Sequence, residues 1–285
     1  MERVQISTFQ LKEIFDYSKH GVSKLKNLSF DKLEFGSVAM EILHPVLGNL
    51  RNLLFEETSL TETQALNLFE FLDDSCSLKN LKLSQTDVTK HPASLLARVI
   101  NKIEMVTLAY FEKEVFAIDT DQLEEIFKTM AKPESATKNL RLGHVENLDN
   151  VNSVVLAKAL NHLESFEFDD YFLVRITESQ TIELFKVMSV KTNLNMLGTP
   201  SQHSMEVDNN MPIGLFQYIH SVEPEVLVKA VNNLESFRLD GTFSLPLTVA
   251  FFKQLNQETR LKSILTKEPC SCLGNEGYEE IVNIK

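Results

Sequence analysis

Pairs of adjacent carboxylates are the residues in this sequence whose types most readily suggest chemistry. General acid–base catalysis needs two such groups at a set separation inside a closed pocket. Neighbouring residues do not supply that separation by themselves, because their side chains diverge. We therefore interpret most pairs as solvated surface and predict no catalytic residue. The pairs are Glu56-Glu57, Asp73-Asp74, Glu124-Glu125, Asp169-Asp170 and Glu279-Glu280.

The sequence contains no other signature of enzyme or metal chemistry. The nine glycines are scattered singly, and no phosphate-binding loop, HExxH or GxSxG motif occurs. The seven histidines show no spacing that would place two ligands on one helical face. Cys270-Ser271-Cys272 is the only clustered thiol pair, and no second pair of zinc ligands lies nearby. The sequence thus predicts a protein that is not an enzyme and uses no cofactor or metal.

A repeated segment organises the chain. Residues 156–168 (LAKALNHLESFEF) recur 71 residues later as residues 227–239 (LVKAVNNLESFRL), with eight of thirteen positions identical. Fainter copies lie at residues 96–108 and 43–55. Each copy shows helical periodicity first and strand alternation afterwards, so the repeating unit is a helix that leads into a strand.

An apolar strand pattern recurs nine times, and helical patterns lie between most of its copies. Shorter and longer units alternate along the chain. The middle apolar residues of the predicted strands are Leu28, Leu53, Leu81, Val106, Leu140, Phe166, Leu197, Phe237 and Ile264. The predicted helices cover residues 63–72, 92–100, 121–130, 153–160, 179–188, 224–231 and 246–255. Thr61, Thr120 and Thr177 are placed to begin three of these helices.

The run SLKNLKLSQTDVT at residues 77–89, followed by a helix and another LxxLxL strand, resembles the leucine-rich repeat. The alternating units with long helices are similar to its ribonuclease-inhibitor-like subtype, over residues 25–267. The resemblance implies an α/β solenoid shaped as a horseshoe, with parallel strands on the concave face and helices on the convex face. The sequence departs from the family after each strand, where Asn or Cys is common. That position holds Thr58, Thr86, Thr242, Phe111, Val145 and Tyr171.

We expect a single leucine-rich-repeat domain over residues 1–285. Residues 1–24 carry one amphipathic pattern and form the expected N-terminal cap, and residues 268–285 form the expected C-terminal cap. An insertion near residues 198–222 has a polar first half, which predicts an exposed loop. Its apolar second half fills the core of the array or, alternatively, takes part in binding. The chain is also compatible with one module of a larger receptor.

Strand alternation sends the residues between the apolar positions to the concave face. They form a first row of Asn27, Asn52, Asn80, Met105, Asn139, Ser165 and Ser236. A second row contains Ser29, Leu54, Lys82, Thr107, Arg141, Glu167 and Arg238, and acidic residues follow at the strand ends. The candidate partner-binding residues are Asp31, Glu56, Glu57, Lys82, Tyr110, Arg141, His144, Glu167, Asp169, Asp170, Tyr171, Arg238 and Asp240.

The formal net charge of −12 disfavours nucleic acid and anionic membranes as partners. A basic protein is the compatible partner, although the charge also serves to keep an elongated protein in solution. The N-terminus lacks the apolar core of a signal peptide, and no stretch approaches the roughly 18 apolar residues of a membrane span. Together with a content of only three cysteines, these features predict a cytoplasmic protein. They leave the oligomeric state open.

We expect a non-enzymatic scaffold that binds a protein partner through its concave face. Tyr110, Tyr171 and Arg141 are the expected anchors, and the acidic edge would steer the encounter. A second hypothesis is an enzyme inhibitor or a GTPase-activating module on the same fold, with Arg141 or Arg238 as the supplied arginine. A third is the ligand-sensing portion of an intracellular immune receptor, although the chain contains no nucleotide-binding domain.

Overall fold

The computed structural model describes residues 4–5, 9–10, 13, 25–35, 40–56, 58–75, 77–84, 86, 88–108, 118–142, 148–168, 176–198, 218–239, 263–266 and 281–283. The chain divides into two compact units, residues 1–146 and residues 147–285. One continuous domain over the whole chain stays a prediction. The two expected caps, the insertion near 198–222 and the predicted helix 246–255 lie wholly or mostly outside the described residues.

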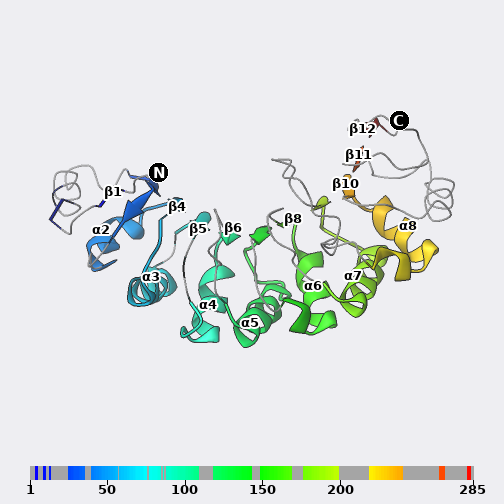
Figure 1. The fold of residues 1–285 in the computed structure, drawn as a ribbon, viewed down its shortest axis with the longest axis horizontal. Coiled ribbons are helices and arrows are strands. Elements are labelled where there is room, and N and C mark those ends of the chain that lie inside the picture. The colour runs from blue at the N-terminus through cyan, green and yellow to red at the C-terminus, as the bar shows by residue number, and fades with distance from the viewer. Residues whose placement is uncertain are drawn as a thin grey trace. The chain divides into compact units, whose positions relative to one another are not determined.

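The first unit alternates strands and helices. Strands β2, β4, β5, β6 and β7 pair in parallel in that order, and β1 pairs in parallel with β3. Helices α3, α4 and α5 pack side by side along one side of these strands (Figure 1). The elements are β1 (Val4–Gln5), β2 (Asn27–Asp31), β3 (Leu33–Glu34), the 3-10 helix η2 (Met40–Leu43), α2 (His44–Leu47), β4 (Asn52–Glu56), α3 (Glu62–Ser75), β5 (Asn80–Leu83), α4 (Ala93–Ile100), β6 (Met105–Leu108), α5 (Thr120–Met130) and β7 (Asn139–Leu142).

The second unit has the same alternation. Strands β8, β9, β10 and β11 pair in parallel in that order, and β12 pairs antiparallel with β11. Helix α7 packs against both α6 and α8. The elements are the 3-10 helix η3 (Leu148–Asn150), α6 (Ser153–His162), β8 (Ser165–Phe168), α7 (Glu178–Val190), β9 (Met196–Gly198), the 3-10 helix η4 (Ile219–Ser221), α8 (Pro224–Asn232), β10 (Ser236–Leu239), β11 (Ser263–Thr266) and β12 (Ile281–Asn283).

The predicted strands and helices are present wherever the structure describes them. All nine middle apolar residues lie in strands, and the ends of helices α3 to α8 agree with those of the first six predicted helices to within three residues. The repeated segment at 156–168 and 227–239 is a helix end followed by a strand in both copies. The protein is therefore an α/β structure of parallel strands and helices, compatible with a repeat solenoid.

The core of the first unit lies between the strands and the helices. In β4, Leu53 and Phe55 are fully buried while the residues that alternate with them are partly exposed, and the strands β5, β6 and β7 repeat this alternation. The rings of Phe30, Phe35 and Phe55 pack against one another, with centroids 5.0 to 5.8 Å apart. Fully burying a side chain of this size stabilises the fold by roughly 2 to 3 kcal/mol relative to leaving it in water.

Each long helix begins with a capping box. In each box, the side chain of the capping residue accepts a hydrogen bond from the backbone N–H of a glutamine three residues later. The side-chain oxygen of that glutamine accepts a hydrogen bond from the backbone N–H of the capping residue. The pairs are Thr61 with Gln64, Asp119 with Gln122 and Thr177 with Gln180. These three glutamines follow one another at intervals of 58 residues. Thr120 is the first residue of the second of these helices, as predicted, and the carboxylate of Asp119 before it takes the capping position.

Two of these glutamines also hold the preceding turn in place. The Nε2 group of Gln122 donates to the carbonyl oxygens of Val88 at 2.7 Å and His91 at 2.6 Å. Gln180 makes the same two bonds, to Leu148 at 2.8 Å and Val151 at 2.6 Å. Both glutamine side chains are buried, so these bonds satisfy carbonyl groups that water cannot reach.

Asparagine at the end of a short helix forms a second tie between neighbouring repeats. Asn101 donates to the carbonyl oxygens of Ala97 at 2.8 Å and Ile126 at 3.2 Å, and it accepts from the hydroxyl of Ser135 at 2.8 Å. Asn161, its counterpart in the repeated segment, donates to the carbonyl of Lys191 at 2.9 Å. In these two copies the asparagine therefore joins the end of a short helix to the following long helix or its C-cap residue.

Buried hydroxyl groups replace apolar or asparagine side chains at the strand ends. Thr137 stands where other repeats have an apolar residue, and its hydroxyl donates to the carbonyl of Ile100 at 3.0 Å. Thr58 is buried after β4, donates to the carbonyl of Glu56 at 2.8 Å and accepts from the N–H of Leu33 at 3.2 Å. These bonds explain how the sequence departs from the strand pattern without leaving a buried polar group unpaired.

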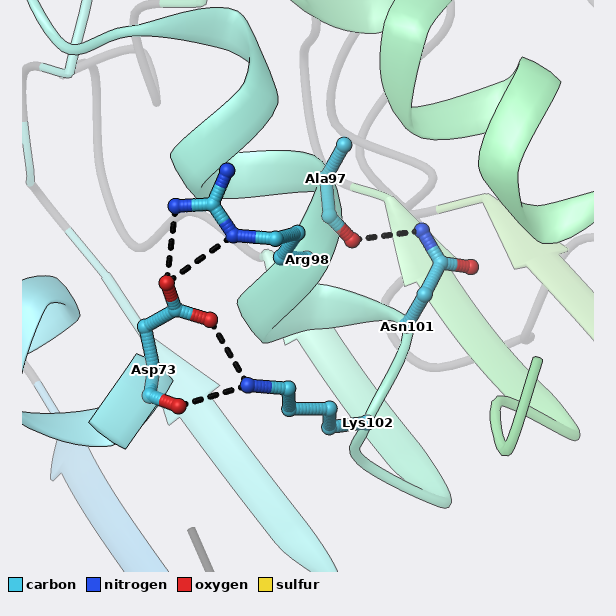
Figure 2. Close-up of polar contacts among 5 residues, drawn as sticks. All are labelled: Asp73, Ala97, Arg98, Asn101 and Lys102. Carbon is cyan, nitrogen blue, oxygen red and sulfur yellow. Dashed lines mark hydrogen bonds and ion pairs between the residues drawn. The ribbon is translucent and has the colours of Figure 1, made fainter. Parts of the chain in front are cut away.

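Charged side chains tie α3 to α4 on the helix side of the first unit. Asp73 accepts hydrogen bonds from Arg98, at 2.9 Å from Nε and 2.7 Å from Nη2, and from Lys102 Nζ at 2.7 Å (Figure 2). Lys102 also donates to the backbone carbonyl of Asp73 at 2.6 Å. The hydrogen bond from Arg98 lowers the pKa of Asp73, burial opposes this, and Lys102 lowers the pKa further.

Replacing Gln122 tests the tie to the preceding turn. Gln122→Leu removes the side-chain donor that bonds the carbonyls of Val88 and His91, which should lower the free energy of unfolding by on the order of 2 kcal/mol. Gln122→Glu keeps an acceptor for the cap but donates only when it is protonated, so the pKa of Glu at this position should be raised. The stability of Gln122→Glu should therefore decline relative to the wild type as the pH rises above about 4.3. Denaturant unfolding at pH 4 and pH 7 measures both effects.

The matched control is Gln180→Leu, which removes the same tie from the second unit, and Glu125→Gln is a control for the charge change on α5. A loss of stability for Gln122→Glu that is the same at pH 4 and pH 7 would contradict the role of the donor.

The Asp73 cluster predicts a dependence of stability on pH. Because the folded-state pKa of Asp73 is lowered, its ionised form contributes stability above the unfolded pKa of about 3.8, and this contribution is lost as the pH falls through the folded pKa. Asp73→Asn should therefore be less stable than the wild type at pH 7, and the difference should shrink below about pH 3.8. Denaturant unfolding of both proteins from pH 7 to pH 3 gives the comparison, with Asp74→Asn as the control. A difference that stays constant over this range would show that Asp73 does not act through its charge.

Candidate binding surface

The strand face of the first unit is the set of side chains on β2, β4, β5, β6 and β7 that alternate with the buried core residues. The parallel register places them in straight rows. The first row contains Asn27, Asn52, Asn80, Met105 and Asn139, and the second contains Ser29, Leu54, Lys82, Thr107 and Arg141. Both rows are the ones predicted for this part of the chain, and every member is half-buried or exposed.

The first row consists of four carboxamide side chains and one apolar side chain. The Nδ2 group of Asn52 donates a hydrogen bond to Oδ1 of Asn27 on the adjacent strand. Met105 is 42% exposed, which is unusual for methionine within a strand of a folded protein. The row therefore offers hydrogen-bond donors, acceptors and one apolar contact but no ionised group.

Charged groups of the strand face lie in the second row and at the strand ends. Asp31 and Glu56 are directly opposite each other at the ends of β2 and β4. Like charges in this position repel each other. Lys82 forms an ion pair with Glu56 at 2.7 Å, with side chains 22% and 36% exposed respectively, and this pair offsets part of the repulsion. Of the two carboxylates, Asp31 is the exposed one.

The structure brings four of the predicted site residues onto one face. Asp31, Glu56, Lys82 and Arg141 all lie on the strand face of the first unit. In the second unit, Glu167 lies in β8 and Arg238 lies in β10, opposite Gly198 and Leu265 respectively. The other predicted site residues lie outside the described residues and stay predictions, namely Glu57, Tyr110, His144, Asp169, Asp170, Tyr171 and Asp240.

Sequence reasoning missed two features of this surface. It assigned Glu56 and Lys82 separately to partner binding, whereas they pair with each other. It also placed the asparagines in a row without recognising that neighbouring carboxamides bond. Both pairs could have been predicted from the register of the strands. That register places Asn27 beside Asn52, and it places Lys82 beside Leu54, which is on the same strand as Glu56.

The described residues show neither a metal centre nor a membrane-spanning helix. No group of three or more His, Cys, Asp or Glu side chains among them could hold a metal ion. None of the helices in this part of the chain combines the length and apolar character needed to cross a bilayer. The chemistry that the strand face offers is hydrogen bonding, apolar contact and charge.

No protein-family model matches this sequence, and no curated protein is significantly similar to it. The function must therefore be inferred from the surface itself.

A double-mutant cycle tests how strongly Glu56 and Lys82 interact. Because both side chains are partly exposed to water and salt, we expect a coupling energy below about 1 kcal/mol that decreases further in high salt. Unfolding of Glu56→Gln, Lys82→Met and the double variant at two salt concentrations measures the coupling. The pair of Lys79 and Glu104, at 3.2 Å with side chains 63% and 43% exposed, is the control and should couple less. A coupling energy that salt does not change would contradict this description of the pair.

Proposed function

We propose that this protein is a leucine-rich-repeat solenoid of the ribonuclease-inhibitor-like subtype and that it acts as a non-enzymatic scaffold for a protein partner. The partner binds to the strand face, which in that fold is the concave face. The observation that carries the proposal is the alignment of half-buried and exposed side chains from five consecutive parallel strands into rows. The partner offers basic groups to the acidic ends of the strands.

The repeat assignment has support from the order of the elements. Strands β4 to β10 each follow a helix, and within each compact unit the neighbouring strands β2, β4, β5, β6 and β7, and β8, β9, β10 and β11, pair in parallel, as expected for stacked repeats. Long helices of 14, 11 and 13 residues alternate with short helices of 8, 10 and 9 residues. This alternation agrees with the subtype that the sequence resembles.

A binding role for the strand face has support from its rigidity and its composition. Backbone hydrogen bonds between strands fix the positions of the side chains, so a partner does not have to pay for ordering a loop. Met105 supplies an exposed apolar contact within a polar row, a combination that is typical of interface centres rather than of inert surface.

The helix side offers less to a partner, because several of its charges already satisfy one another. Asp73 is bonded to Arg98 and Lys102, Glu62 pairs with Lys90 at 2.7 Å, and Glu124 pairs with Lys128 at 2.8 Å. A partner would have to break these pairs or leave them at the rim. This contrast favours the strand face.

Affinity capture with matched variants tests the proposal. Met105→Arg places a charge in the first row, and Val154→Arg places the same charge on α6, at a residue that is 43% exposed compared with 42% for Met105. Proteins that bind through the strand face should be recovered by the wild type and by Val154→Arg but reduced at least about tenfold with Met105→Arg, a loss of roughly 1.4 kcal/mol. Quantitative mass spectrometry of the recovered proteins gives the comparison.

Both variants should unfold at the temperature of the wild type, because neither replaces a buried residue. If no protein is recovered, or if every recovered protein binds equally well to Met105→Arg, the strand face is not the binding surface.

A further inference from the structure

We infer that the strand face of the first unit binds an extended peptide segment of the partner, in which a basic residue lies about four positions from an apolar residue. The peptide crosses the strands between the first and the second row. This inference rests on the proposed function and specifies the class of partner. It follows from the arrangement of carboxamide, apolar and acidic side chains on this face.

The carboxamides of the first row match the hydrogen-bonding groups of a peptide backbone. Each of Asn27, Asn52, Asn80 and Asn139 carries an N–H₂ group and a carbonyl oxygen with two lone pairs, so one bond between neighbours leaves further capacity on both. A peptide group likewise offers one donor and one acceptor. A row that contains no charged side chain therefore suits an uncharged backbone better than it suits ionised side chains.

The segment of the partner that faces this row must carry backbone N–H and C=O groups that are not already hydrogen-bonded within the partner. In a folded domain most backbone groups are already paired within helices and sheets, so a folded surface would present mainly side chains to the carboxamides. An extended segment outside regular structure carries its backbone groups in a line and unpaired by its own chain. The linear arrangement of the row thus favours an extended segment.

The spacing of the row agrees with the spacing of an extended chain. Neighbouring strands lie about 4.8 Å apart, so Asn80 on β5 and Asn139 on β7 are separated by two spacings, or about 9.6 Å. Three residues of an extended peptide span about 10 Å. The two carboxamides can therefore reach backbone groups three residues apart, while Met105 on β6 contacts the side chain between them.

Apolar and acidic residues on the same face define the side chains of the peptide. Leu54 in the second row and Met105 in the first row lie on either side of β5, where a peptide between the rows would meet both. Asp31 is the exposed carboxylate at the end of β2, three strand spacings or about 14 Å from β6. Four extended residues cover about this distance across the strands when an apolar side chain contacts Met105. Asp31 lies one row beyond Ser29, about 7 Å further along β2, so a basic residue at that point reaches it through the length of its Lys or Arg side chain.

A displayed library of random seven-residue peptides, selected on the purified full chain, tests the inference. Enriched peptides should combine Lys or Arg with an apolar residue about four positions away. One such peptide is then synthesised with a fluorescent label, and its affinity is measured for the wild type and for the variants. Asn80→Leu should weaken binding about tenfold or more, because it removes the bonds of one carboxamide in a nearly isosteric way. Asp31→Asn should weaken binding a few-fold, less so in high salt.

Two controls separate the peptide site from a change in folding. The same peptide with N-methyl groups on the backbone nitrogens near its apolar residue should bind the unaltered protein at least about tenfold more weakly, which requires no protein variant. Glu70→Gln on the outer side of α3 removes a carboxylate distant from the strand face and should leave the affinity unchanged.

The inference is overturned if selection on the wild type enriches no peptide over selection on Asn80→Leu, or if N-methylation leaves the affinity unchanged. If captured proteins nevertheless depend on Met105, the partner binds through a folded surface. The proposed function then stands and the peptide inference falls. If neither proteins nor peptides depend on Met105, both are wrong.

Discussion

Polar backbone groups at the turns are the constraint on which the structure depends. In every helix–strand repeat the chain must reverse direction twice, and each reversal leaves carbonyl groups that no strand or helix partner satisfies. Side-chain amides supply the missing donors. Gln122 and Gln180 bond the turns before α4 and α6, and Asn101 bonds the end of α4 to α5. Because the bonds of Gln122 and Gln180 and the bond from Asn101 to Ile126 join residues of neighbouring repeats, satisfying the turns also fixes how those repeats stack.

The same carboxamide chemistry has two different consequences on the two sides of the strands. Buried glutamines such as Gln122 have their donors committed to carbonyl groups, and they stabilise the fold. On the strand face, Asn27 and Asn52 bond to each other and remain partly exposed to solvent. Burial therefore separates the amides that are committed to the fold from the amides that stay exposed, although the Asn and Gln side chains differ by only one methylene group.

Much of the fold is predictable from the sequence because strand alternation and helical periodicity are local. The buried positions of Leu53 and Phe55, and the exposed positions between them, follow from a period of two. Thr137 shows where such local rules stop. A threonine at an apolar position is tolerated because the carbonyl of Ile100 lies nearby, and this depends on the path of the chain, which a local pattern does not contain. The capping role of Asp119 is local, because Gln122 lies only three residues later and the two residues form a capping box.

The candidate surface depends on the core through the register of the strands. A shift of one residue in β5 would exchange Lys82 with its buried neighbours Leu81 and Leu83, so the leucines would be exposed and the ion pair with Glu56 would be lost. The buried leucines therefore determine which side chains stand in the two rows. The core therefore imposes the geometry that a partner of these rows would recognise. Loops between neighbouring repeats can vary in length without moving the rows. Because the core and not the loops sets the register, repeats of unequal length along the chain are compatible with straight rows on the strand face.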